Sequence, residues 1–224
     1  MQKIQEIIDR LLHFEPIQYI FGHTLWNGLD LLVTPATLIP RPETAELVEK
    51  ILSTLNFKLS TAHISVLDVG TGSGCIAIAL KKAHPEWQVT GIDISPEAIE
   101  VASENAKRNS VEVDFKVADI FDFNGDFDIV VSNPPYICES EKVSMRPNVL
   151  NYEPASALFV PDNDPLRFYR CIAELKLGKY LFFEINEAHP NELSAMLSEL
   201  GYTDIIITND IYGKPRIIEA RLVQ

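Results

Sequence analysis

The sequence of 224 residues contains few cysteines and no Cys/His cluster. Its three cysteines, Cys75, Cys138 and Cys171, are far apart and form neither a Cys-x-x-Cys pair nor a metal-ligand pattern. This spacing argues against a structural zinc site, and we expect no metal. A small, odd number of cysteines is typical of a reducing compartment, so we expect a cytoplasmic protein.

Positive charge is also scarce. Lys and Arg number 19 against 32 Asp and Glu, which gives a formal net charge of −13. Because phosphate contacts supply much of the affinity of nucleic-acid-binding proteins, this balance disfavours direct nucleic-acid binding. No apolar run reaches the roughly 18 residues of a membrane span, and the segment 1–16 is amphipathic rather than an apolar signal core. We expect no membrane association, and a monomer.

The remaining composition is that of a globular protein, with 46% hydrophobic and 23% charged residues. The length suits one large domain with a small extension. We expect residues 1–34 to form the extension, an N-terminal helix with a linking β-hairpin, and residues 35–224 to form the main domain. Trp26 and Phe21 are expected to pack these two parts together.

Local signals support this division. Apolar residues at helical spacing predict a helix over about the first dozen residues, ended by Glu15-Pro16. Asn27-Gly28 between apolar flanks predicts the hairpin turn. A proline-rich loop then leads to a helix that begins at Pro42.

From residue 63 onward, predicted strands and helices alternate. The expected strands are 64–69, 88–94, 113–117, 127–132, 179–185, 203–208 and 216–223. The expected helices are 75–83, 96–109, 166–175 and 192–200. This alternation predicts an α/β fold with a mostly parallel seven-stranded sheet, and the short turn before the last strand makes that strand antiparallel. The segment 133–165 reads as a long loop, and such loops are usually functional.

A glycine-rich turn, Val-Leu-Asp-Val-Gly-Thr-Gly-Ser-Gly, occupies residues 66–74 between a strand and a helix. Glycines allow a sharp turn and a close approach of a ligand to the main chain. Asp93 ends the next strand about 20 residues later, where an acid binds ribose hydroxyls. Together they predict a site for a nucleoside-type ligand, and the alternative is a merely structural strand–helix turn.

The most specific motif is Asn-Pro-Pro-Tyr at residues 133–136, after the fourth expected strand. Two prolines fix the backbone and remove two N–H donors, which leaves carbonyls exposed. The carbonyls of Asn133 and Pro134 can accept the two hydrogens of a planar –NH2 group, and the ring of Tyr136 can pack on its plane. The motif predicts a site that positions an amino group for reaction. The alternative is a proline-rich turn.

These motifs resemble those of known enzymes. Asp68 with the glycines of residues 70–74 resembles motif I of class I S-adenosylmethionine (SAM) methyltransferases, whereas a dinucleotide site would have Gly-x-Gly-x-x-Gly. The sequence Val-Ala-Asp-Ile at residues 117–120 resembles the family motif whose acid accepts from the adenine amino group. Asn-Pro-Pro-Tyr resembles the motif of amino-methyltransferases, which act on adenine, cytosine or glutamine amide nitrogens.

The flanking segments distinguish among these substrates. Residues 15–22, 33–43, 133–137 and 152–158 closely resemble the bacterial release factor glutamine methyltransferases, the PrmC or HemK family. The resemblance implies a Rossmann-like class I methyltransferase fold. It also implies methyl transfer from SAM to the side-chain amide nitrogen (N5) of the glutamine in the Gly-Gly-Gln motif of peptide chain release factors.

The same resemblance implies the site residues. SAM contacts are expected at Gly70, Thr71, Gly72, Ser73, Gly74, Asp93, Ile94, Asp119, Ile120 and Asn133. Glutamine contacts are expected at Asn133, Pro134, Pro135 and Tyr136, of which Asn133, Pro134 and Tyr136 are the catalytic candidates.

Two features depart from the family pattern. Family members usually have a longer helical domain ahead of residues 15–22, so residues 1–34 are expected to be a remnant of a helical substrate-recognition domain. Ile120 stands where an aromatic residue often packs on adenine. Asp119 has an alternative role as a helix cap. Arg41 could anchor a loop over the SAM site, cap a helix or pair with Glu43.

Other functions remain as alternatives. A DNA or RNA adenine amino-methyltransferase uses the same Asn-Pro-Pro-Tyr chemistry on a flipped base, but it would need a basic recognition region. A SAM-binding regulatory module without turnover would not need an intact Asn-Pro-Pro-Tyr motif. A nicotinamide dehydrogenase would need the spacing of the third glycine that this turn lacks.

Overall fold

A seven-stranded sheet forms the centre of the molecule in the computed structural model, which describes residues 2–58 and 63–223. The strand order is β10-β11-β9-β6-β3-β4-β5. The strands are β3 (Ser65–Val69), β4 (Gln88–Asp93), β5 (Asp114–Val117), β6 (Phe127–Ser132), β9 (Gly178–Glu184), β10 (Tyr202–Asn209) and β11 (Pro215–Leu222). The last strand, β11, is antiparallel to both neighbours, and the other pairs are parallel. The predicted sheet is therefore confirmed.

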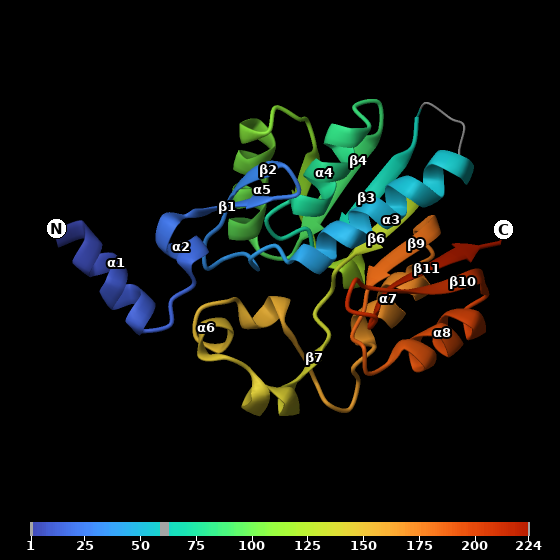
Figure 1. The fold of residues 1–224 in the computed structure, drawn as a ribbon. Helices are drawn as coiled ribbons and strands as arrows, with labels where there is room; N and C mark the ends of the chain where they lie inside the picture. The colour runs from blue at the N-terminus through green and yellow to red at the C-terminus, as the bar shows by residue number, and fades with distance from the viewer. Residues whose placement is uncertain (1, 59–62, 224) are drawn as a thin grey trace.

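Helices cover both faces of this sheet (Figure 1). α3 (Pro42–Lys58), α4 (Cys75–Ala83) and α5 (Pro96–Arg108) pack on one face, and α7 (Arg167–Leu175) and α8 (Pro190–Glu199) pack on the other. Successive residues of β3 pack on opposite faces of the sheet. Val66 packs in the core beneath α3, α4 and α5, and Leu67 packs in the core beneath α7 and α8. Such two-sided burial explains why the strands read as continuous apolar runs.

The N-terminal region contains α1 (Gln2–Leu12), α2 (Ile17–Phe21), β1 (His23–Trp26) and β2 (Leu29–Leu32). The predicted hairpin is confirmed, with β1 and β2 antiparallel about Asn27-Gly28. The sequence did not predict α2. The first helix ends at Leu12, four residues before Pro16, and Pro16 is the N-cap of the new helix.

Trp26 and Phe21 have opposite environments. Trp26 is buried in the core beside the α3 face of the sheet, and its indole N–H donates to the backbone carbonyl of Arg41 at 2.7 Å. Phe21 is 55% exposed, so the prediction that it packs the two parts together is wrong. It lies at the end of α2, not on the hairpin, and the hairpin buries Leu29 and Leu31 instead.

The long segment after β6 has structure of its own. It contains β7 (Ile137–Cys138), η2 (Glu139–Ser144), α6 (Pro147–Leu150), η3 (Ala155–Ala157) and β8 (Phe159–Val160). β7 and β8 pair in parallel, which closes the segment into a compact lobe below the sheet edge (Figure 1). These short turns leave no helical or strand periodicity in the sequence.

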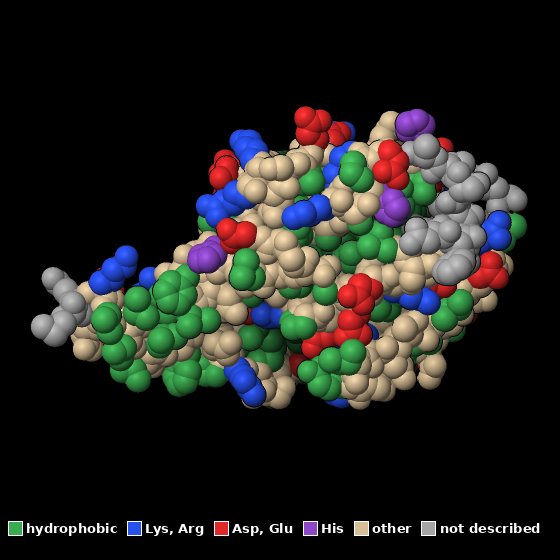
Figure 2. Space-filling model, turned by 45° about the horizontal axis from the view of Figure 1, so that its top comes forward, with side chains coloured by type: hydrophobic (Ala, Val, Ile, Leu, Met, Phe, Trp, Pro, Cys, Tyr) green, Lys and Arg blue, Asp and Glu red, His purple; other side chains and the backbone are tan. Residues whose placement is uncertain are grey.

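Hydrophobic side chains gather at the N-terminal end of the molecule, where α1 projects from the body (Figures 1 and 2). Exposed apolar residues there include Ile4, Leu12, Phe14 and Phe21. None of the helices within residues 2–58 and 63–223 combines the length and apolarity needed to cross a bilayer.

Candidate active site

The site lies at the carboxyl edge of the parallel strands, where ligands bind in open α/β sheets. β3 ends at Val69, β4 at Asp93, β5 at Val117 and β6 at Ser132, and each strand is followed by one of the predicted motifs. Because neighbouring parallel strands end at the same edge, four separate sequence segments meet there.

The glycine turn after β3 leads directly into α4. Gly72 has a φ of +54°, a conformation that other residues rarely adopt, and almost nothing lies near the position of a Cβ atom. Gly74 has a different role. A Cβ atom there would lie 3.0 Å from the ring of Phe115 and 3.1 Å from Ala102, so this glycine lets α4 pack closely against its neighbours. The first positions of the turn thus face open space, and the last is a packing position.

Asp68 lies behind this turn and is fully buried. Its Oδ2 accepts from the Thr71 hydroxyl at 2.6 Å and from the Ala77 N–H at 3.2 Å. Its Oδ1 has no hydrogen-bond partner among the described residues. Burial raises the pKa of Asp68 to about 7. Asp68 does not line the cavity described below, so it supports the glycine turn from behind through Thr71 and Ala77.

Asp93 links the end of β4 to the glycine turn. One carboxylate oxygen accepts from the Gly72 N–H and the other from the Ser95 N–H, both at 2.9 Å. An ionised carboxylate has about four acceptor positions, so each oxygen retains one. Asp93 can therefore hold the turn and still accept from two ligand hydroxyls.

Asp119 follows β5 and caps the short helix η1 (Ile120–Asp122), accepting from the Phe121 N–H at 3.0 Å. Asp119 therefore does cap a helix, which was the alternative to its role in the ligand site. It also lines the cavity described below, so capping does not remove it from the site. Ile120 is buried, whereas the neighbouring Phe121 is 42% exposed and lies near Phe168, with ring centroids 5.8 Å apart.

The Asn-Pro-Pro-Tyr motif follows β6. The Asn133 side-chain N–H donates to the Thr44 hydroxyl at 3.2 Å. The Tyr136 hydroxyl donates to the Glu184 carboxylate at 3.2 Å, and burial raises the pKa of Tyr136 well above its ordinary value. The Tyr136 side chain thus contacts Glu184 at the end of β9.

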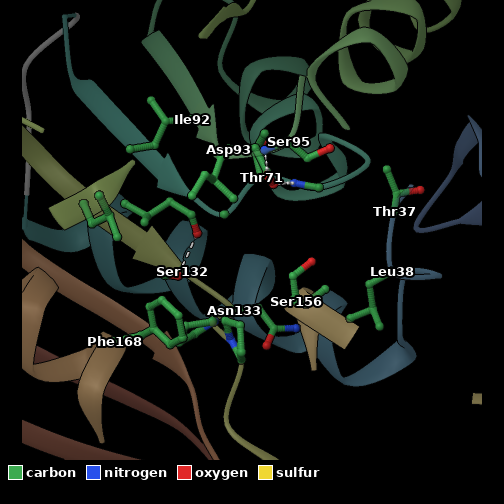
Figure 3. Close-up of a pocket in the computed structure, with 18 of the residues that line it drawn as sticks. Thr37, Leu38, Thr71, Ile92, Asp93, Ser95, Ser132, Asn133, Ser156 and Phe168 are labelled. Carbon is green, nitrogen blue, oxygen red and sulfur yellow. Dashed lines mark hydrogen bonds between the residues drawn. The ribbon is translucent and has the colours of Figure 1, made fainter. Parts of the chain in front are cut away.

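These elements enclose a cavity of about 450 Å³, a size typical of small-molecule sites (Figure 3). Predicted site residues that line it are Gly70, Thr71, Gly72, Ser73, Asp93, Ile94, Asp119, Ile120, Asn133, Pro134 and Pro135. Gly74 and Tyr136 are not among the lining residues. Figure 3 shows Thr71 and Asp93 on one side of the cavity and Asn133 on another.

No group of three or more His, Cys, Asp or Glu side chains in the described part of the chain could hold a metal ion. The cavity instead combines a glycine turn, two carboxylates and an amide with apolar walls. That combination fits an adenosyl ligand, because Asp93 can accept from hydroxyls, Asp119 can accept from an amino group and the apolar walls can pack on a ring.

Comparisons with known proteins agree with this chemistry. Residues 60–162 match the family model described as a methyltransferase domain. The chain is 46% identical over 228 residues to the release factor glutamine methyltransferase of Bacteroides thetaiotaomicron, covering 98% of this chain and 80% of the relative. It is 44% identical to the enzyme of that name from Flavobacterium psychrophilum, covering 96% and 78%.

The chain belongs to the release factor glutamine methyltransferase family. It is therefore an enzyme of the methyltransferase class. Its fold is also that of solved methyltransferases. The hMettl16 catalytic domain, solved with a MAT2A 3′UTR hairpin, matches with a TM-score of 0.67 over 88% of this chain and 77% of that one, at 16% identity. The predicted class I methyltransferase fold is thus confirmed.

Arg41 joins two loops of this family member. Its guanidinium donates to Oε1 of Glu153 at 2.7 Å, and Oε2 of Glu153 accepts from the Ile39 N–H at 3.2 Å. Three roles were considered for Arg41, and one of them was an ion pair with Glu43. The structure shows an ion pair, but its partner is Glu153. Glu153 belongs to the segment 152–158 that resembles the family, and Arg41 itself lines the cavity.

Several lining residues of this methyltransferase were not predicted. Thr37 and Leu38 come from the loop after β2, Thr44 from the first turn of α3, Ser156 from the segment after β6 and Phe168 from the first turn of α7. Thr37, Leu38, Thr44 and Ser156 lie inside or beside the segments that resemble the family, whereas no such signal marks Phe168. Apolar and hydroxyl residues in loops carry no chemical pattern of their own.

Proposed function

We propose that the protein transfers a methyl group from SAM to the side-chain amide nitrogen of the glutamine in the Gly-Gly-Gln motif of peptide chain release factors. The observation that carries this proposal is the position of Asn133 and Pro134 on the wall of the cavity that also contains the glycine turn. Further support comes from relatives named release factor glutamine methyltransferases.

SAM would lie between the glycine turn and the carboxylates. Asp93 would accept from the ribose hydroxyls, Asp119 from the adenine amino group, and Ile120 and Ile94 would contact the adenosine. The backbone of residues 70–73 would approach the methionine end, with Gly74 shaping the turn. When bound, SAM supplies an electrophilic methyl group on a sulfonium.

The protein's own task is to make a poor nucleophile react. An amide nitrogen shares its lone pair with its carbonyl, so it must be held close to the methyl and correctly aimed. The Asn133 and Pro134 carbonyls would accept the two N–H bonds of the glutamine. These hydrogen bonds strengthen as positive charge develops on nitrogen, which stabilises the transition state. The prolines and the apolar walls would exclude water, and the departing proton would leave to solvent after transfer.

Tyr136 has a supporting place in this scheme. Its hydroxyl is bonded to Glu184 and it does not line the cavity, so it would act mainly by fixing the motif. Pro135 lines the cavity beside Pro134 and would contact the glutamine side chain.

The protein partner would be the release factor itself. We propose that residues 1–34 belong to a substrate-recognition region and residues 35–224 to the catalytic domain. We further propose that the enzyme acts in the cytoplasm as a monomer, without direct contact with nucleic acid or membrane. The net charge of −13 favours a protein substrate over DNA or RNA.

Methyl transfer from labelled SAM tests this function. The acceptors are wild-type release factor, its Gln→Glu and Gln→Asn variants, and single-stranded and duplex DNA. Only the wild-type factor should be labelled well, because glutamate lacks the –NH2 group. Asparagine is one methylene shorter and should react about a hundredfold more slowly. Label on DNA alone would favour the adenine methyltransferase.

A further inference from the structure

The amide of Asn133 is one end of a buried hydrogen-bond relay that crosses three elements. Its Nδ2 donates to Oγ1 of Thr44 at 3.2 Å, in the first turn of α3. The Thr44 hydroxyl donates to Oε2 of Glu184 at 2.6 Å, at the end of β9. Thr44 is 2% exposed and Glu184 is 1% exposed, so both groups are largely shielded from bulk water.

The number of hydrogens available in this relay determines which group donates in each hydrogen bond. A threonine hydroxyl has one hydrogen, and an ionised carboxylate has none. The single hydrogen of Thr44 lies on the short bond to Glu184, as expected when the acceptor is charged. The Thr44 oxygen can therefore only accept from Asn133. The end of the Asn133 amide that faces Thr44 must then be the –NH2 group.

The opposite end of the amide is the carbonyl oxygen Oδ1. Asn133 lines the cavity, so a fixed Nδ2 leaves Oδ1 as the end available to a substrate. Rotation of the amide by half a turn would exchange the two ends and present a donor to the cavity. That orientation would repel the –NH2 group that the reaction needs to hold.

Glu184 is itself held from its other side. Its Oε1 accepts from the Tyr136 hydroxyl at 3.2 Å, and Arg216 favours its charged form by electrostatic attraction. Tyr136 is in turn fixed through its backbone carbonyl, which accepts from the side chain of Asn186 at 3.1 Å. Both carboxylate oxygens thus receive a hydrogen from a defined donor.

We infer that Thr44 and Glu184 are positioning residues that set the orientation of the Asn133 amide and so select an amide over a carboxylate in the acceptor. This inference rests on the proposed function, because it assumes that Asn133 accepts from the substrate's –NH2 group. Tyr136 acts in the same relay, through Glu184.

Thr44→Val tests this role because valine has nearly the shape of threonine and lacks the hydroxyl. With no acceptor for its Nδ2, the Asn133 amide adopts both orientations. The turnover of release factor methylation should fall at least about tenfold, a change of about 1.4 kcal/mol in the barrier. SAM affinity, measured by calorimetry, should remain within about twofold of wild type. Thr44→Ser restores the hydroxyl and should restore most of the turnover.

Thr54→Val is a matched control. Thr54 also lies on α3 and also donates to a glutamate of a neighbouring strand, Glu219 of β11, at 3.1 Å. It does not line the cavity. The same chemical change there should leave turnover unaltered.

A second measurement separates orientation from general damage. The Gln→Glu release factor is used as a competitive inhibitor of the wild-type enzyme and of Thr44→Val at the same pH. In the wild type, Oδ1 of Asn133 faces the glutamate carboxylate and repels it. In Thr44→Val the rotated amide donates to that carboxylate, so inhibition should become several-fold tighter.

The outcomes are distinct. Lower turnover, tighter inhibition by the Gln→Glu factor and rescue by Thr44→Ser support the inference. Wild-type turnover in Thr44→Val, or weaker binding of both release factors alike, would overturn it. Should Thr44→Val fail to fold, Thr44→Ala gives the same comparison. Failure of the proposed function is recognised separately, because the wild-type enzyme would then leave the release factor unmethylated.

Discussion

Arg41 and Glu153 form an ion pair of 2.7 Å between two loops that lie 112 residues apart in the sequence. The Glu153 side chain is only 1% exposed, whereas that of Arg41 is 33% exposed. The pair therefore connects a deeply buried carboxylate to a cation at the cavity wall. Together with the hydrogen bond from the Ile39 N–H to Glu153, it ties residues 39–41 to the segment that contains Ser156 and Ala157.

Arg41→Gln should destabilise the protein more than Glu153→Gln. Removing the arginine leaves a buried charge without its partner, which costs about 3 kcal/mol, whereas neutralising Glu153 leaves no buried charge. Chemical denaturation of the two variants measures the difference in the free energy of unfolding. Equal losses would show that Glu153 is hydrated and that the pair does not hold the loops together.

Asp93→Ala should weaken SAM binding by about 1–3 kcal/mol, the usual cost of losing a charged hydrogen bond. Isothermal titration calorimetry measures this directly. Glu97→Ala is the control, because Glu97 is a nearby exposed acid whose carboxylate accepts from the Ser95 hydroxyl and which does not line the cavity. An unchanged affinity in Asp93→Ala would remove Asp93 from the cofactor site.

Asn133→Ala should separate catalysis from cofactor binding. We expect turnover to fall by orders of magnitude, because the acceptor nitrogen loses a group that orients it, while SAM affinity falls only modestly. Single-turnover kinetics and calorimetry on the same preparation supply the two values. Similar losses in both would mean that Asn133 mainly builds the SAM site.

Asp68 gives a prediction about pH. Burial raises its pKa from 3.8 to about 7, so between these values the native state binds more protons than the unfolded state. The contribution of Asp68 to stability is therefore greatest at low pH and falls as pH rises, by on the order of 2–4 kcal/mol. Between about pH 5 and pH 8, the free energy of unfolding of Asp68→Asn should fall less than that of the wild type.

The control for this slope is Asp122→Asn, which changes an exposed acid. Its unfolding free energy should follow the wild-type dependence on pH. If the unfolding free energy of Asp68→Asn also follows the wild-type dependence on pH, Asp68 ionises at its ordinary pKa despite its burial.

The sheet and most of its helices could be predicted from the sequence because their signals are local. α4 was predicted with its observed bounds, and the glycine turn and Asp93 were placed by spacing alone. Their meeting at one edge follows from parallel strand order. The short helix α2 was missed because a proline after an apolar helical pattern indicates a helix end, whereas α1 already ends at Leu12 and Pro16 is the N-cap of α2.

The residues that orient the site could not be found in this way. Thr44 and Glu184 are 140 residues apart, and nothing in either local sequence indicates that they are hydrogen-bonded. Gly74 was predicted as a ligand contact because it belongs to the glycine pattern, yet it does not line the cavity, and a Cβ atom there would meet Phe115 and Ala102. Such roles depend on tertiary packing, which cannot be predicted from the pattern of residues along one segment.

The central claim concerns the glutamine of the release factor. The most direct test incubates purified release factor with the enzyme and SAM, digests it and locates added methyl groups by mass spectrometry. We predict one methyl group on the side chain of the Gly-Gly-Gln glutamine with the wild-type enzyme, and an unmodified glutamine with Asn133→Ala. A release factor that stays unmodified with active wild-type enzyme, or a methyl group on another residue, would contradict the account.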